Sequence, residues 1–239
     1  MPERFRPLVE ATAGLAERFS AAGRSLYLVG GSVRDALIEA PGSHPGPGDA
    51  DFDFDLTTDA RPDEIEALVA GWADAVWTPG KRFGTIGARH AGRRYEITTH
   101  RAEAYRPDSR KPDVTFGDDV ERDLSRRDFT VNAMALALPA MTLVDPFNGI
   151  ADLAAGRLRT PLEPDVSFGD DPLRMLRAAR FSAGYGLKPD PALVDAVRRG
   201  HHRLDIVSAE RIRDELDKLV VLELGRDLEE TVAMEGHHH

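Results

Sequence analysis

The chain has 239 residues, which is enough for one large domain or for two small domains with separate cores. Hydrophobic residues make up 41% of it and charged residues 30%, a composition that indicates a globular protein and excludes a largely disordered one. The absence of cysteine excludes disulfides and thiolate metal sites. The formal net charge of −10 argues against a uniform basic coat for binding nucleic acid.

The charge is unevenly distributed along the chain. Between residues 172 and 203 there are seven basic residues against two acidic ones, so this segment carries +5 and the remainder −15. Such an asymmetry is expected if one part of the chain holds a metal and another binds a polyanion. No apolar run reaches membrane-spanning length and the first residues lack a signal-peptide core, so we expect a cytoplasmic protein with no membrane contact. The final GHHH, residues 236–239, resembles the start of a purification tag.

The N-terminal elements predict an anion site. Residues 5–22 have apolar positions at helical spacing, and the apolar run 26–29 predicts a buried strand that breaks at the glycine pair 30–31. Ser32 is predicted to cap the next helix. A strand, a glycine turn and a helix start expose backbone N–H groups, and Arg34 in the first turn is unfavourable there unless an anion is bound. A glycine pair is also common in ordinary turns.

The stretch DADFDFDLTT, residues 49–58, predicts an acidic strand. Asp51, Asp53 and Asp55 alternate with apolar residues, so their carboxylates share one face of the strand while the apolar side chains share the other. Like charges at this spacing repel one another, and either a proton or a hard cation must relieve the repulsion. Magnesium is the natural candidate for that cation. The alternative is a solvated edge strand with a polar face.

The middle of the chain predicts a hairpin and a long loop. Residues 83–101 predict two strands with a turn near 91–92, and Glu96 lies on the returning strand. Glu96 joins the aspartates if its strand neighbours theirs, and is otherwise an exposed strand residue. Residues 103–123 mix proline, glycine and charge, which predicts a loop that is either disordered or functional. Ser125 is predicted to cap the apolar stretch that follows, whose spacing is helical or mixed.

An arginine ladder opens the basic part of the chain. Asp171 is predicted to cap a helix that has Pro172 at its first position. Arg174, Arg177 and Arg180 recur every three residues, so they form a stripe along one side of that helix. Asp171 and Arg174 can form an ion pair, a clasp across one helical turn. The pair would present carboxylate acceptors beside guanidinium donors, and this combination could hydrogen-bond a base. The alternative is a solvated basic face with an ordinary cap.

Seven sequence blocks place these features in a known context. They are LVGGSVRD, DFDLTT, FGTIGARHAGRRYEITTHR, DLSRRDFTVNAMAL, DPFNGIADLAAGRLRT, FGDDPLRMLRAARF and SAERIRDELDKL. In this order, over residues 26–219, they resemble the bacterial tRNA nucleotidyltransferase and poly(A) polymerase family, the class II branch of the polymerase-β-like nucleotidyltransferases.

The resemblance implies an α+β fold. It implies a mixed-sheet nucleotidyltransferase head over residues 1–160, an all-α neck over 161–235 and a tag remnant over 236–239. Asp53 and Asp55 would be catalytic and bind Mg²⁺, Asp51 would be an extra acid, and Glu96 would be a third catalytic carboxylate.

The resemblance also implies a nucleotide site and an RNA partner. The implied nucleotide-binding residues are Gly30, Gly31, Ser32, Arg34, Arg127, Asp128, Asn132, Asp171, Arg174, Arg177 and Arg180. Gly31 and Arg34 would contact the triphosphate, Arg127 and Asp128 the ribose, and the residues from Asp171 onward would read the base of CTP or ATP. The implied activity is addition of CCA to the 3′ end of tRNA.

The sequence departs from the family pattern in three places. Asp170 stands where the family usually has Glu, and the PGSHPGPG insertion, residues 41–48, lengthens the path to the aspartates. The chain also ends soon after the last block, which leads us to expect a truncated catalytic core. Alternative functions are poly(A) polymerase, partial CC- or A-addition and, in another class, a non-catalytic RNA-binding module.

Overall fold

The computed structural model describes residues 3–38, 52–103 and 115–235, and side chains within 3–38, 52–101 and 116–222. Asp51, the PGSHPGPG insertion and the GHHH end therefore lie outside the described residues. The chain forms two compact units, Met1–Ala151 and Asp152–His239. The expected boundary after residue 160 stays a prediction.

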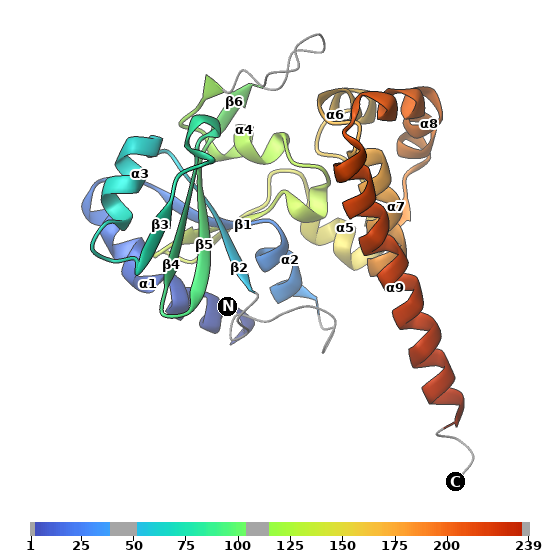
Figure 1. The fold of residues 1–239 in the computed structure, drawn as a ribbon, viewed down its shortest axis with the longest axis horizontal. Helices are drawn as coiled ribbons and strands as arrows, with labels where there is room; N and C mark the ends of the chain where they lie inside the picture. The colour runs from blue at the N-terminus through green and yellow to red at the C-terminus, as the bar shows by residue number, and fades with distance from the viewer. Residues whose placement is uncertain (1–2, 39–51, 104–114, 236–239) are drawn as a thin grey trace. The chain divides into compact units, whose positions relative to one another are not determined.

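A seven-stranded mixed sheet forms the centre of the first unit (Figure 1), with the strand order β3-β4-β5-β2-β1-β8-β9. Its strands are β1 (Leu26–Val29), β2 (Asp53–Thr58), β3 (Ala75–Trp77), β4 (Thr85–His90), β5 (Arg93–Thr99), β8 (Ala135–Leu138) and β9 (Thr142–Val144). The β2–β5 pair is parallel, whereas the other neighbouring pairs of this sheet are antiparallel. A separate antiparallel pair joins β6 (Arg101–Glu103) to β7 (Thr115–Phe116).

Short helices surround this sheet. They are η1 (Glu3–Phe5), α1 (Arg6–Ala21), α2 (Gly31–Leu37), α3 (Pro62–Val69), η2 (Lys81–Phe83), α4 (Val120–Ser125) and η3 (Thr130–Asn132), and α5 (Gly149–Ala155) follows. Helices α1 and α3 lie on one side of the sheet, away from α2 and α4 (Figure 1).

One face of the central strands packs into the core because its residues are apolar. Phe54 and Leu56 of β2 are fully buried, as are Tyr95 and Ile97 of the parallel neighbour β5. The Phe54 and Tyr95 rings stack with centroids 4.8 Å apart, and the Tyr95 hydroxyl donates to the carbonyl oxygen of Ala11 in α1 at 2.8 Å. Because strand side chains alternate, the core fixes which residues of β2 and β5 face the other way.

The second unit is helical. It contains α6 (Pro164–Asp170), α7 (Arg174–Tyr185), α8 (Pro191–Gly200), η4 (His201–Ile206) and the long α9 (Ala209–Glu235), with a short parallel pair of β10 (Arg157–Leu158) and β11 (Lys188–Pro189). Helix α7 packs against α9, and Glu215 of α9 is 3% exposed. The predicted α+β class, a mixed-sheet unit followed by a helical one, is confirmed. No helix of the described residues is long and apolar enough to span a membrane.

Three predicted helix starts are wrong. Ser32 lies inside α2, whose preceding residue is Gly30, so the serine side chain does not cap the helix. Ser125 is the last residue of α4, and Asp119 caps that helix by accepting the Glu121 backbone N–H at 2.8 Å. The helix containing the arginine ladder begins at Arg174 rather than directly after Asp171.

The apolar stretch after Ser125 also differs from its helical or mixed interpretation. It forms the 3₁₀ turn η3 and then strand β8, which pairs with β1 in the sheet centre. A short apolar run suits a buried strand as well as a buried helix, and here the sheet decides between them. The predicted loop 103–123 likewise contains β7 and the start of α4 within its described part.

Candidate active site

Three carboxylates share the face of the sheet that lies opposite the core. Asp53 and Asp55 alternate with buried residues of β2, and their side chains are 52% and 45% exposed. Glu96 of β5 pairs with Asp55 in the parallel register, so its side chain leaves the sheet on the same face. The structure therefore places Glu96 beside the aspartates, which is one of the two alternatives that the sequence left open.

The clustering of charge perturbs these acids. Burial raises the pKa of Asp55, and the Arg127 guanidinium opposes that rise. Burial also raises the pKa of Glu96, and repulsion from Asp55 and Asp53 raises it further. Both shifts show that negative charge on this face is costly without a cation.

Two arginines partly neutralise the carboxylates. Arg127 Nη1 lies 3.4 Å from Asp55 Oδ2, and Arg94 Nε lies 3.4 Å from Asp53 Oδ1. Burial disfavours the charge on Arg127, but Asp55 and Asp123 raise its pKa. Distances of this length are at the long limit of hydrogen bonding, so each arginine pairs only loosely with its aspartate.

Asp123 was missed by sequence reasoning. It is 6% exposed, lies 3.4 Å from Arg127 Nη2, and accepts the Arg101 backbone N–H at 3.1 Å. Its i, i+4 spacing from Arg127 was the signal that could have identified it. Asp123 and Asp55 hold Arg127 from two sides, which directs the guanidinium toward the carboxylate face.

The glycine turn comes directly against this cluster. Gly30 has φ 70° and ψ −135°, a backbone conformation that only glycine adopts readily. A Cβ atom at Gly30 would lie 3.4 Å from both Asp55 Oδ2 and Arg127 Nη1. The backbone that connects β1 to α2 thus lies against the acid and the cation together.

Arg34 belongs to a buried polar network beside that turn. It is 6% exposed, and its Nη1 donates to Asn132 Oδ1 while its Nε donates to Asp35 Oδ1 at 2.9 Å. Asn132 Nδ2 in turn donates to Asp128 Oδ1 at 3.0 Å. The structure therefore brings Arg34, Asp128 and Asn132 together in one network with Asp35.

The donor set suits a hard divalent cation. The candidate ligands are carboxylate oxygens, the ligands that Mg²⁺ prefers, and they lie on the same face of the paired strands β2 and β5. Among the described residues, no group of three or more acidic, histidine or cysteine side chains is arranged to hold a metal. The ligands that fit are therefore the pair Asp53 and Asp55, with Glu96 beside them.

The expected clasp between Asp171 and Arg174 is not what the second unit shows. Asp171 Oδ1 accepts the Leu173 backbone N–H at 3.1 Å, and its Oδ2 pairs with Arg211 Nη2 at 2.9 Å. Arg174 Nη1 donates to the carbonyl oxygen and the hydroxyl of Ser167 at 3.1 and 3.0 Å. The two side chains are thus each fixed, but by other partners within their own unit.

The arginine ladder is not a solvated basic face either. Arg180 Nε pairs with Glu215, and Arg177 Nη1 lies 3.9 Å from the same carboxylate. Both guanidiniums also approach the Phe181 ring, at 5.5 Å for Arg177 and 4.8 Å for Arg180. Glu215 of α9 thus accounts for part of the positive charge that the sequence concentrates on α7.

Two family models match parts of this chain. Residues 26–159, more than half of the chain, match the family described as the poly(A) polymerase head domain. Residues 186–227 match a region described as "Probable RNA and SrmB- binding site of polymerase A".

Three of the matching relatives are described as CCA-adding enzymes. A CCA-adding enzyme of Lactobacillus helveticus is 40% identical over 199 residues, which are 83% of this chain and 46% of that protein. The solved CCA-adding enzyme of Bacillus stearothermophilus in complex with CTP is 32% identical with a TM-score of 0.75, over 92% of this chain and 49% of that one. The Thermotoga maritima CCA-adding enzyme complexed with tRNA is 28% identical with a TM-score of 0.66, over 86% and 45%. The chain spans about half the length of the curated relatives it matches.

Proposed function

We propose that this chain, which belongs to the poly(A) polymerase head-domain family, transfers nucleotides from CTP and ATP to the 3′ end of tRNA. The observation that carries the proposal is the pairing of β2 with β5, which puts Asp53, Asp55 and Glu96 on one open face beside Gly30 and Arg127. A carboxylate pair next to a backbone turn and a cation is what metal-assisted phosphoryl chemistry requires.

The descriptions of the relatives favour CCA as the sequence that is added. The Bacillus stearothermophilus relative binds CTP and the Thermotoga maritima relative binds tRNA, and both are CCA-adding enzymes. We therefore assign the same substrates, CTP, ATP and a tRNA 3′ end, to this chain.

Asp53 and Asp55 would hold Mg²⁺, with Glu96 adjusting the charge around it. The chemistry that such ions supply is a lowered pKa for the RNA 3′-hydroxyl and compensation of charge on the triphosphate. Arg127 pairs only loosely with Asp55, so its guanidinium would be available to an anionic phosphate oxygen.

The remaining residues orient the nucleotide. The backbone N–H groups of Gly30 and Gly31 would bind phosphate oxygens, and Ser32, the next residue, would add a hydroxyl. The buried network of Arg34, Asn132 and Asp128 would fix the turn and the ribose side of the site.

In the second unit, we assign base reading to Asp171 and Arg174, with Arg177 and Arg180 as supporting cations. A bidentate contact to a base edge discriminates by about 1–3 kcal/mol. Ser167 and Arg211 restrict the side chains of Arg174 and Asp171, which lowers the entropy lost when a base binds.

The direct test is to incubate the protein with Mg²⁺ and a tRNA transcript that lacks its last three nucleotides, and to resolve the products at single-nucleotide resolution. Each nucleoside triphosphate is supplied alone and then with the others. The proposal predicts addition of C, C and A followed by a stop. A long A tail would instead identify a poly(A) polymerase, and a stop after two C residues or the addition of a single A would identify a partial enzyme.

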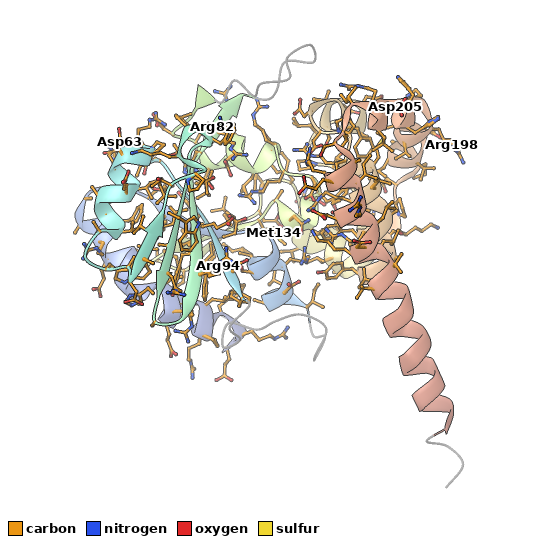
Figure 2. All side chains as sticks on the ribbon, in the orientation of Figure 1. Asp63, Arg82, Arg94, Met134, Arg198 and Asp205 are labelled. Carbon is orange, nitrogen blue, oxygen red and sulfur yellow. The ribbon has the colours of Figure 1, made fainter. Side chains whose placement is uncertain are left out.

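The matched variants are Asp53→Ala and Asp63→Ala. Asp63 is an exposed acid on α3 (Figure 2), so its loss leaves the carboxylate face intact. We expect Asp53→Ala to abolish incorporation while CTP binding largely survives, and Asp63→Ala to add nucleotides at the parental rate. Failure of the unaltered protein to add any nucleotide would favour a non-catalytic RNA-binding module.

A further inference from the structure

Two cross-strand rows extend from the catalytic carboxylates to the edge of the sheet. In one row, Asp55 of β2 pairs with Glu96 of β5, Glu96 with Gly87 of β4, and Gly87 with Trp77 of β3. Paired residues leave a sheet on the same face, so Trp77 lies on the carboxylate face, where it is partly exposed.

The second row is basic. Asp53 of β2 pairs with Arg94 of β5, Arg94 with Arg89 of β4, and Arg89 with Ala75 of β3. Two arginines directly opposite each other destabilise a sheet by their repulsion. Arg89 is exposed and, within the part of the chain that the structure describes, has no acidic partner. The cost of this arrangement is relieved if an anion binds across the two guanidiniums.

The Trp77 ring lies flat on the sheet because position 87 is glycine. A Cβ atom on Gly87 would come within 1.9 Å of Trp77 Nε1, so any side chain there would displace the indole. Arg94 extends between the two rows, with its Cζ 5.5 Å from the Trp77 ring centre and its Nε 3.4 Å from Asp53 Oδ1. Arg94 is labelled in Figure 2. The two cations thus lie on β5 and β4, the first and second strands beside β2, and the aromatic ring lies on β3, the third.

This surface and the nucleotide site flank the carboxylates on opposite sides. The strand order places β1, which leads into the Gly30 turn, on one side of β2, and β5, β4 and β3 on the other. An in-line displacement needs the attacking hydroxyl and the leaving group on opposite sides of the reacting phosphorus. If the triphosphate occupies the Gly30 side, the strand of RNA that provides the hydroxyl has to approach from the side of Trp77.

We infer that Trp77, Arg89 and Arg94 form the binding surface for the last nucleotides of the single-stranded RNA primer. The Trp77 ring stacks a base, and Arg89 and Arg94 bind its neighbouring phosphates, so that the 3′-hydroxyl is directed toward Asp53 and Asp55. Stacking on an aromatic ring beside a cationic groove is a general mode of binding single-stranded nucleic acid. The inference rests on the proposed function for its choice of ligand, and it assigns positioning roles to three residues that the nucleotide does not use.

Direct binding tests this inference without any need for catalysis. A fluorescein-labelled single-stranded RNA that ends in the sequence of a tRNA 3′ end is titrated by anisotropy in the absence of nucleotide and metal, and protein fluorescence is followed in parallel. We expect RNA to quench Trp77 emission in the unaltered protein and no such quenching in Trp77→Phe. We expect Trp77→Ala to weaken RNA binding about tenfold and Trp77→Phe to retain most of it, because base stacking needs a ring rather than an indole N–H.

The arginines are tested by salt dependence, with control variants on β3 and β5 whose side chains leave the sheet on the other face. Removing Arg89 should reduce the slope of log affinity against log salt concentration by about 0.7. Val76→Ala, on β3 but pointing to the other face, and Arg93→Ala, likewise on β5, should bind RNA as the unaltered protein does. Thermal unfolding verifies that every variant is folded.

A purely structural role gives a different pattern. If Trp77 only shields the Gly87 backbone, Trp77→Ala lowers the melting temperature and leaves RNA affinity unchanged, which overturns the inference. Absence of any RNA binding by the unaltered protein also overturns it. In a primer-extension assay, the inference predicts a higher KM for RNA in Trp77→Ala with an unchanged KM for CTP. A protein that binds RNA through Trp77 but adds no nucleotide would refute the proposed function alone.

Discussion

Replacing Gly30 with alanine tests whether the site depends on backbone conformation. The φ of 70° and ψ of −135° at Gly30 are strained for any residue with a Cβ, at a cost of about 1–3 kcal/mol. The new Cβ would lie 3.4 Å from Asp55 Oδ2 and Arg127 Nη1, an ordinary van der Waals distance, so backbone strain rather than a clash dominates. A loss of this size lowers the melting temperature by about 3–9 °C in a domain of this length.

The matched control is Gly92→Ala in the β4–β5 hairpin turn. Gly92 has φ 76° and no atom within 4 Å of its virtual Cβ, so it carries backbone strain without any contact with the site. We expect both variants to melt at lower temperature, but only Gly30→Ala to weaken CTP binding measured by titration calorimetry. If Gly30→Ala keeps both the parental melting temperature and the parental CTP affinity, the argument from the glycine turn is refuted.

Three further substitutions probe the electrostatics and packing. Burial and repulsion by Asp55 raise the pKa of Glu96, so the folded protein loses stability as pH rises through that pKa. Glu96→Gln should therefore increase the free energy of unfolding by about 0.5 kcal/mol at pH 8 without divalent metal. Urea titrations should show that this increase vanishes below about pH 4, where Glu96 is protonated in both states. Glu215→Ala leaves Arg180 without its buried carboxylate and should destabilise the helical unit by about 3 kcal/mol, measured by hydrogen exchange in α7. Tyr95→Phe loses the hydrogen bond to α1 and should cost about 1 kcal/mol in urea unfolding, whereas an unchanged midpoint would exclude a stabilising role for that bond.

The sequence predicted those elements whose signals are local. The alternation in DFDLTT predicted a strand with acids on one face, and β2 is such a strand with Phe54 and Leu56 buried. The hairpin was predicted from two β-runs around a glycine turn, and β4 and β5 turn at Ala91 and Gly92 with positive φ. Period and turn chemistry act over a few residues, so both are visible without a structure.

The features that sequence reasoning left open or predicted wrongly depend on distant partners. Glu96 faces Asp55 only because β2 and β5 pair in parallel, and no local pattern specifies that register. Asp171 was expected to clasp Arg174, but Arg211, forty residues further along, competes for the carboxylate. A cap or clasp predicted from neighbouring residues fails when tertiary structure offers a better-placed partner.

Binding of Mn²⁺, a spectroscopic substitute for Mg²⁺, reports directly whether Asp53 and Asp55 are metal ligands. Electron paramagnetic resonance titration in the presence of CTP counts the ions bound to the unaltered protein, to Asp53→Asn and Asp55→Asn, and to the control Asp63→Asn. If Asp53 and Asp55 ligate the metal, Asp53→Asn and Asp55→Asn should lose protein-bound Mn²⁺, whereas the control Asp63→Asn should retain it. Equal Mn²⁺ binding by all four proteins would contradict the assignment of Asp53 and Asp55 as the metal ligands.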